Sequence, residues 1–280
     1  MKQNKRSLIL WLVLIVVLAV ASVLTGTPGG ESESVKAVMR DAVLHETGQV
    51  SLFGIMDVNP GLISAYVVTA ALLVLAVCLR IFAVPHFTEV PGKLQMLLEL
   101  WVDTFRGMAE KNSPHNNKVL GPYLFGAGTY IFVSTLFELL GVQVVTTAGH
   151  SLALPAPLSD VNAAIAMGVL SYLFIMSGGV SAVGIRGVGR TLKEFSLPIS
   201  MSFRLFGALL SGLLVTELVY YYITLSYVLP VIVGVMFTML HSLIQSYVLT
   251  MLVALYYGEV SEPVQPKVKK NKKNSDALAA

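Results

Sequence analysis

The chain has 280 residues, of which 55% are hydrophobic and only 12% are charged, and its mean hydropathy is +0.74. Soluble domains carry about 25% charged residues, so this composition excludes an ordinary soluble globule, as well as a disordered, fibrous or disulfide-stabilised chain. The net charge of +3 is spread between apolar runs and forms no basic face, so no nucleic acid is expected as a partner. The composition predicts an all-α integral membrane protein.

The first 60 residues predict an N-terminal membrane segment followed by an external one. Residues 1–24 join a basic hexapeptide to an apolar run, and Ala19-Val20-Ala21 resembles a small-residue cleavage site. A signal peptide is the favoured interpretation, and an uncleaved anchor fits the same residues. Residues 25–60 are polar and mildly acidic, which predicts an external segment.

Five further apolar runs are each long enough to cross a membrane as a helix. They predict five membrane-spanning helices in the mature chain, the last two long and forming a tilted hairpin, within a membrane domain of residues 61–258. The runs cover residues 61–84, 123–144, 161–185, 197–224 and 228–257.

Residues 91–112 differ from these runs because apolar and charged residues alternate at helical spacing. Leu94, Leu97, Leu98, Trp101, Phe105 and Met108 form the apolar side. The pattern predicts an amphipathic helix that lies along the membrane surface or against a partner, and does not span the membrane.

The basic residues predict the orientation of the spans. They collect in the N-terminal hexapeptide, in 93–118, in 186–193 and in the tail 259–280, and the positive-inside rule places these segments in the cytoplasm. The C-terminus is therefore expected inside, and a cleavable signal with a lysine-rich tail fits a bacterial inner membrane. The tail either only fixes this topology or also attracts anionic lipid.

Arg204 is the most informative residue, because a permanently charged guanidinium inside an apolar helix is expensive. Gly207, Ala208 and Ser211 lie on its side of the helix, so another helix could approach closely there. A cation on such a surface suits a partner that carries a carboxylate, whose ionised form it would favour. A buried structural ion pair with Glu138 or another acid of this chain is the alternative.

Glu217 and His241 are the next candidates. Glu217 lies about 220° around the helix from Arg204 and about 20 Å further along it, where a separate aqueous route would need an acid. His241 lies on the antiparallel last span, and histidine is a common proton carrier, so the two side chains could form a proton route. A satisfied interior histidine is an equally good interpretation of His241.

The remaining polar groups in the spans have structural explanations as well. Gln245 shares the His241 face, and Tyr256 continues it; the amide could orient Arg204 or only join two helices. Asp160 and Asn162 begin a span, where an aspartate is a good N-cap.

The sequence has no motif for catalytic, metal or cofactor chemistry. Its one cysteine, Cys78, lies inside an apolar run, so it forms no intrachain disulfide or thiol cluster. The glycines between Gly178 and Gly189 lack the Gly-Lys-Ser/Thr ending of a phosphate loop. We expect no catalytic residue, no metal and no cofactor.

Four segments together resemble subunit a of the rotary F-type ATP synthase. Arg204 to Gly207 with Ser211-Gly212 is similar to the arginine motif of that family, and Pro157 to Asn162 to its external approach to the middle span. Pro91 to Gln95 and Gln245 to Tyr256 are similar to its surface helix and last span. The resemblance covers residues 60–262 in the family's order.

The resemblance implies a non-catalytic ion-channel subunit of the F-type ATP synthase complex. Such a subunit holds two half-channels against a rotating c-subunit ring and couples the proton gradient to ATP synthesis in partner subunits. It also implies peripheral-stalk b subunits and membrane lipid as partners. Arg204 would separate the half-channels with Gln245 beside it, and Glu217 and His241 would line the external one. Further lining candidates are Glu138, Asp160, Asn162, Ser211 and Tyr256.

The sequence departs from the family's pattern around the arginine. Ala208 stands where asparagine is usual, Leu213 stands at a common acid position, and Glu217 and His241 each lie about one turn further on. Our hypothesis is a pair relocated together along one channel. A stand-alone secondary transporter that binds an anionic substrate through Arg204 is the alternative function, although no internal repeat is visible. A third hypothesis is a purely structural membrane scaffold, but this function would not explain the positions of Arg204 and Glu217.

Overall fold

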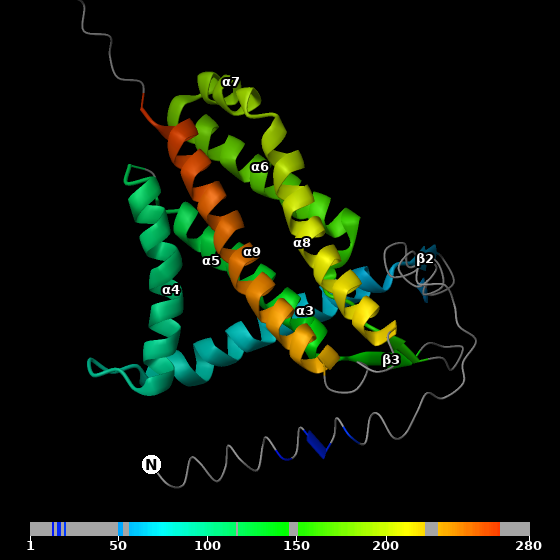
Figure 1. The fold of residues 1–280 in the computed structure, drawn as a ribbon. Helices are drawn as coiled ribbons and strands as arrows, with labels where there is room; N and C mark the ends of the chain where they lie inside the picture. Colours follow the sequence, from blue (N-terminus) through cyan, green and yellow to red (C-terminus); the bar gives the residue numbers. More distant parts are fainter. Residues whose placement is uncertain are drawn as a thin grey trace, which may run out of the picture.

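The computed structural model describes residues 50–52, 56–115, 117–145, 151–221 and 229–263, with four isolated positions in the N-terminal run. Figure 1 shows that helices carry the fold between residues 60 and 261, with two short hairpins beside them. The predicted segment 1–24 and most of the tail lie outside the described residues. The helices are α3 (Pro60–Cys78), α4 (Lys93–Asn112), α5 (Leu120–Leu136), α6 (Val161–Val183), α7 (Ile185–Lys193), α8 (Ser196–Tyr221) and α9 (Leu229–Ser261). The antiparallel hairpins are β1 (Val50–Leu52) with β2 (Met56–Val58), and β3 (Gln143–Val145) with β4 (Ser151–Ala153).

Four helical segments of the described chain are long and apolar enough to cross a membrane. They are Pro60–His86, Leu120–Leu140, Val161–Val183 and Val231–Ser261. A fifth span is formed if the bent pair Ile185–Lys193 and Ser196–Gly212 counts as one. Each of the five predicted apolar runs forms a helix over most of its described length, as expected for an integral multi-pass membrane protein, while the second run ends in a turn and strand β3.

The fourth span differs from its prediction because it is a broken helix. α7 occupies the basic segment 186–193, to which the sequence analysis assigned no helix, and the chain bends by 53° before α8. Pro198 lies in the first turn of α8, where its missing N–H leaves no hydrogen bond unmade. α7 packs on α6 because Gly187 and Gly179 touch backbone to backbone, which leaves no room for a side chain at either position.

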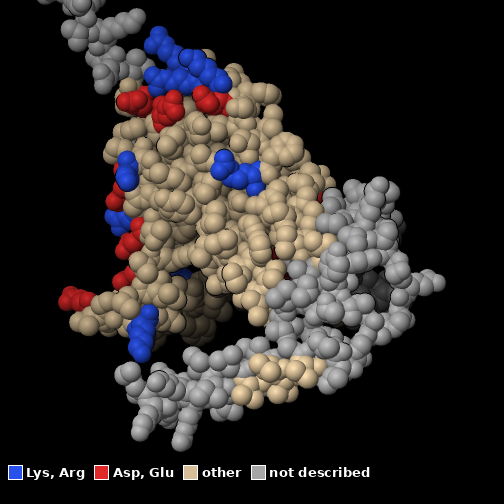
Figure 2. Space-filling model, in the orientation of Figure 1, with Lys and Arg blue, Asp and Glu red and all other residues tan. Residues whose placement is uncertain are grey.

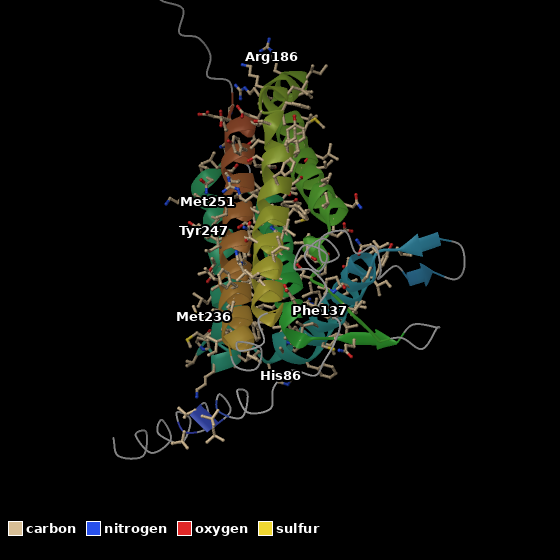
Figure 3. All side chains as sticks on the ribbon, turned by 45° about the vertical axis from the view of Figure 1, so that its right-hand side comes forward. His86, Phe137, Arg186, Met236, Tyr247 and Met251 are labelled. Carbon is tan, nitrogen blue, oxygen red and sulfur yellow. The ribbon has the colours of Figure 1, made fainter. Side chains whose placement is uncertain are left out.

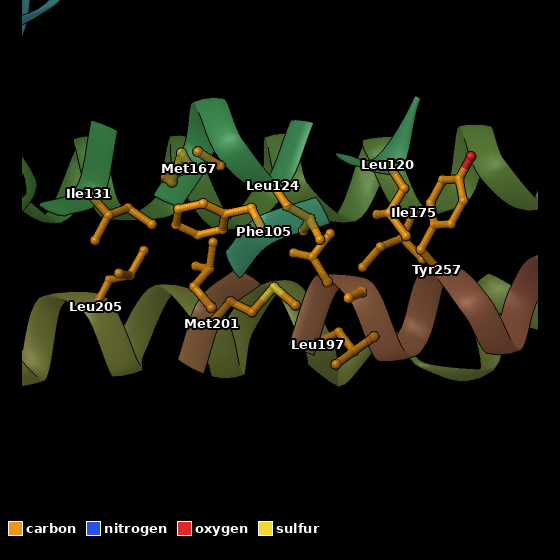
Figure 4. Close-up of a cluster of buried hydrophobic side chains, with 14 of the residues drawn as sticks. Phe105, Leu120, Leu124, Ile131, Met167, Ile175, Leu197, Met201, Leu205 and Tyr257 are labelled. Atoms are coloured by element: carbon orange, nitrogen blue, oxygen red, sulfur yellow. The ribbon is translucent and has the colours of Figure 1, made fainter. Parts of the chain in front are cut away.

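The core lies where α5, α6, α8 and α9 meet. Figure 4 shows Ile131 and Leu124 of α5, Ile175 of α6 and Leu205 of α8 converging on one cluster. Gly168 brings α6 onto the start of α8, since a Cβ there would lie 2.9 Å from the Pro198 carbonyl oxygen. The cluster is almost entirely aliphatic and aromatic, so it holds the helices in place without using the charged groups.

α4 lies beside α5 and α9 and has three different faces (Figure 1). On the bundle side, Trp101 packs edge-on against Phe105, and its Nε1 donates a hydrogen bond to Thr129 Oγ1 at 2.9 Å. The charged face carries Glu99, Asp103, Arg106 and Glu110. A third face is exposed although it is apolar: Met96, Leu97 and Leu100. A packed, a charged and an exposed apolar face suit a helix at the boundary of protein, water and lipid, which supports the surface-helix prediction.

Most predicted cytoplasmic segments meet at one end of the bundle. Arg190 of α7 donates a hydrogen bond to the Glu262 carbonyl oxygen at 2.7 Å, and a ring nitrogen of His115 lies 3.0 Å from Ser261 Oγ. Figure 3 shows Arg186 at this end and Met251, Tyr247 and Met236 in order along α9 away from it. Basic side chains gather here in Figure 2, while most of the face below them is uncharged. These contacts join the end of 93–118, the segment 186–193 and the start of the tail on one side, as the charge pattern predicts, whereas His86, just before 93–118, lies at the opposite end of the bundle in Figure 3.

Candidate functional site

Arg204 lies on the exposed surface of α8, eight residues after the helix begins. Among the described residues it makes no hydrogen bond and no ion pair, so the alternative of a structural ion pair with Glu138 is wrong. Glu138 lies in the turn Phe137–Leu140 after α5, is half-buried and has contacts of its own. The cation is therefore presented outward from an apolar helix without a counter-charge within the described chain.

The surface around Arg204 is open and made of small residues. A Cβ built on Gly207 would meet no atom within 4 Å, and Ser211 is exposed with its hydroxyl bonded to the Ala208 carbonyl at 2.9 Å. No helix of the described chain covers this face. The close-approach surface that the sequence predicts around the arginine is present, and it is free for a partner.

Gln245 lies on α9 and is a buried polar residue whose hydrogen bonds are incomplete. Its side chain is buried, yet its Oε1 has no hydrogen-bond partner, which is true of no other buried side-chain atom in the described residues. Nearby hydroxyls differ, because Ser246 donates to the Gly128 carbonyl at 2.8 Å and Thr250 to that of Ser246 at 2.6 Å. Burying an amide oxygen without a hydrogen bond costs about 1–3 kcal/mol of folding free energy. Such an atom therefore indicates a role other than stabilising the fold.

His241 lies one turn before Gln245 and contacts α8. Its ring stacks on Phe237 with 5.8 Å between the centroids, and a Cβ on Gly212 would be 3.5 Å from its Nδ1. The ring makes no hydrogen bond within the described residues, and both interpretations of His241 stay predictions. The sequence analysis missed Phe237, although an aromatic residue one turn before a histidine was a visible signal.

The contact between His241 and Gly212 sets the antiparallel register of the two helices, which lie side by side in Figures 1 and 3. In this register Gln245 is level with Ala208, which is four residues or about 6 Å along the axis from Arg204. Glu217 is five residues beyond Gly212, about 7.5 Å along α8 from the level of His241. The backbone of Glu217 is helical, and its side chain lies outside the described residues.

The other lining candidates lie apart from this pair. Asp160 caps α6, since its Oδ1 accepts a hydrogen bond from the Asn162 N–H at 3.1 Å, which confirms the capping interpretation. Asn162 is exposed in the first turn of α6. Tyr256 packs half-buried against the core, eleven residues beyond Gln245. The structure therefore places His241 against Gly212, next to Ser211, and sets Gln245 one helical turn from the level of Arg204, while Asp160, Asn162 and Tyr256 lie elsewhere. The turn that carries Glu138 contacts α9 as well.

A comparison with protein families gives one match for this arrangement. The family model described as ATP synthase A chain matches residues 64–258. The matched range runs from the first turns of α3 to the last turn of α9, so it contains every residue of the candidate site.

Proposed function

Since the chain belongs to the ATP synthase A chain family, subunit a of the F-type ATP synthase, we propose that it forms the ion path of the membrane sector. In this proposal it provides two half-channels against a rotating c-subunit ring and couples the proton gradient to ATP synthesis. Family membership makes it a multi-pass subunit of that membrane sector; the half-channels and the ring contact are our proposal. The observation that carries it is the open, unpaired Arg204 in the apolar helix α8.

The argument from Arg204 is one of charge compensation. A cation at membrane depth costs at least about 2.5 kcal/mol, and no described residue of this chain offsets it. A carboxylate on a closely approaching partner would offset the charge and would itself be held in the ionised form. A ring of c subunits that presents such carboxylates in turn would release each ion beside Arg204.

The other residues take roles from their places around the arginine. Gln245, level with Ala208, would accept a hydrogen bond from the Arg204 guanidinium with its unpaired Oε1 once the partner is seated. His241 and Glu217 would line the external half-channel on the far side of Gly212. Ser211 borders the open face, and Glu138, Asp160, Asn162 and Tyr256 would contribute at most to the outer parts of the path.

The remaining assignments follow from the family and the charge pattern. We propose peripheral-stalk b subunits and membrane lipid as further partners, a bacterial inner membrane as the location, and a cytoplasmic C-terminus. Residues 1–24 would be a signal peptide or anchor, 25–60 external, 61–258 the membrane domain and 259–280 the basic tail. Catalysis would reside in partner subunits.

The alternative of a stand-alone transporter is disfavoured by the position of Arg204. A transporter would hold its anionic substrate in a cavity, and Arg204 lines neither the groove between α6 and α8 nor the cleft between α3 and α4. A residue on an open outer surface binds a partner more readily than an enclosed small molecule.

The test compares wild type with Arg204→Ala in inverted membrane vesicles that contain the complex. We expect ATP-driven lumen acidification to disappear while co-purification of the complex persists, because an unpaired exposed side chain stabilises nothing in the fold. Arg106→Ala, which removes an exposed arginine of α4, is the matched control and should pump normally. Normal pumping by assembled Arg204→Ala would refute the proposed function.

A further inference from the structure

A cleft lies at the corner where α3 ends and α4 begins, away from the Arg204 face. The chain leaves α3 through the helical turns Leu79–Ala83 and Val84–His86 and enters α4 at Lys93. The cleft between these segments has a volume of about 590 Å³. It is lined by Phe82, Ala83, His86, Phe87, Thr88, Val90, Gly92, Lys93, Leu94 and Gln95.

The cleft is preformed because a buried amide fastens its loop to α4. Gln95 Oε1 accepts a hydrogen bond from the Thr88 N–H at 3.1 Å, and Gln95 Nε2 donates to the Thr88 carbonyl oxygen at 2.9 Å. The same Nε2 lies 2.7 Å from Glu99 Oε1, so that carboxylate is already engaged on α4. These contacts hold the loop without using His86 or Lys93.

One wall of the cleft is polar and cationic. Lys93 is exposed and makes no ion pair in the described part of the chain. His86 Nδ1 lies 2.8 Å from the Phe82 carbonyl oxygen and donates to it, so this ring is already engaged within the chain. Glu89 belongs to the same loop and does not line the cleft. The uncompensated charge of this wall fits an anion.

The other wall is apolar and continues into exposed hydrocarbon-facing surfaces. Phe82 is 70% exposed and Val90 is 85% exposed at the mouth of the cleft. Beyond them lie the exposed residues of α3 from Leu73 to Ile81 and the third face of α4 (Met96, Leu97 and Leu100). A ligand that matches both walls has an anionic head and long apolar tails.

We propose that the α3–α4 corner binds an anionic phospholipid. Its phosphate is held by the Lys93 ammonium, and its acyl chains lie along the exposed apolar faces of α3 and α4. Basic pockets beside membrane helices bind such head groups, and long lysine side chains reach the interface readily. The site is separate from the proposed ion path, and it requires only that the chain lies in a membrane.

The experiment measures lipid retained by the purified complex in mild detergent, by native mass spectrometry, after adding phosphatidylglycerol or phosphatidylcholine. Removing one cation near a lipid surface should weaken phosphatidylglycerol binding about fivefold, so Lys93→Gln should retain correspondingly less. Val90→Glu, which places a negative charge at the mouth, should also lower retention. Lys93→Arg and the control Lys118→Gln, an exposed lysine outside the cleft, should match wild type.

Four results would overturn the proposal. The first is unchanged phosphatidylglycerol retention in both Lys93→Gln and Val90→Glu. The second is equal retention of phosphatidylcholine, and the third is displacement by inorganic phosphate, which would make the cleft a site for free anions. The fourth is protection of Lys93 from chemical acylation by a partner's transmembrane helix in complex from which the lipid has been removed. Pumping is not the readout, so this test fails or succeeds independently of the proposed function.

Discussion

Two sides of α9 differ in whether their polar groups are hydrogen-bonded: the side that packs on α5 and the side that faces α8 and Arg204. In the sealed region, where α9 packs on α5, the hydroxyls of Ser246 and Thr250 are buried and hydrogen-bonded to backbone carbonyls. In the open region, Arg204 has no partner in the described chain and Gln245 has an unbonded Oε1. The small hydroxyl residues therefore join helices within the chain, while the arginine and the amide remain available to interact with a partner subunit.

The largest effect should come from filling the tight contact between α6 and α8 at Gly168. Leucine there would collide with Ser202 and with the Pro198 carbonyl oxygen, so α6 and α8 could not pack at their present distance. Because the Pro198 oxygen and the Ser202 nitrogen are backbone atoms that cannot move aside alone, we expect Gly168→Leu to abolish accumulation of the chain in membranes, measured by quantitative immunoblot. Normal accumulation would contradict the packing described here. Gly126→Leu, at a position with open space around its Cβ, is the matched control.

The open region should respond in the opposite way when Gly207 is filled. A side chain there meets nothing within 4 Å in this chain, so Gly207→Leu should leave accumulation unchanged. It should lower ATP-driven pumping at least about tenfold, because a bulky group keeps the partner from approaching Arg204. Equal pumping at equal accumulation would show that no partner comes close to this face.

A smaller effect should separate Gln245 from its neighbour Ser246. Gln245→Leu removes an unbonded buried oxygen, so the chain purified without its partners should keep or slightly raise its thermal unfolding midpoint. Ser246→Ala removes a made hydrogen bond and should cost about 0.5–1.5 kcal/mol. Pumping by the assembled complex should fall only in the Gln245 variant. The reverse pattern would mean that Gln245 is structural.

Much of the fold could be predicted because its signals are local. The five apolar runs and the amphipathic stretch 91–112 are each visible in a window of some 20 residues, and the structure has helices at all of them. α7 was missed since its short, basic segment carries no long apolar run. The break before α8 depends on the packing of Gly187 against Gly179, which no local pattern reveals.

The candidate site divides in the same way. A charge within an apolar run is a local feature, so Arg204, Gln245, His241 and Glu217 could be named from the sequence alone. Whether Arg204 pairs with Glu138 depends on which helices meet, and the structure answers that it does not. The level of His241 beside Gly212 likewise comes only from the register of α8 on α9.

The sequence by itself determined that the chain is a membrane protein and where its helices lie. It also identified the charged and polar residues whose insertion into the membrane costs enough free energy to indicate a function. Hydropathy and helical period are properties of consecutive residues, so they need no knowledge of the fold. Only the tertiary structure decided which polar groups are satisfied and which stay open. That outcome depends on contacts between residues far apart in the chain, as at Ser246 with Gly128 and at the α3–α4 corner, where Gln95 fastens the loop and leaves Lys93 unpaired.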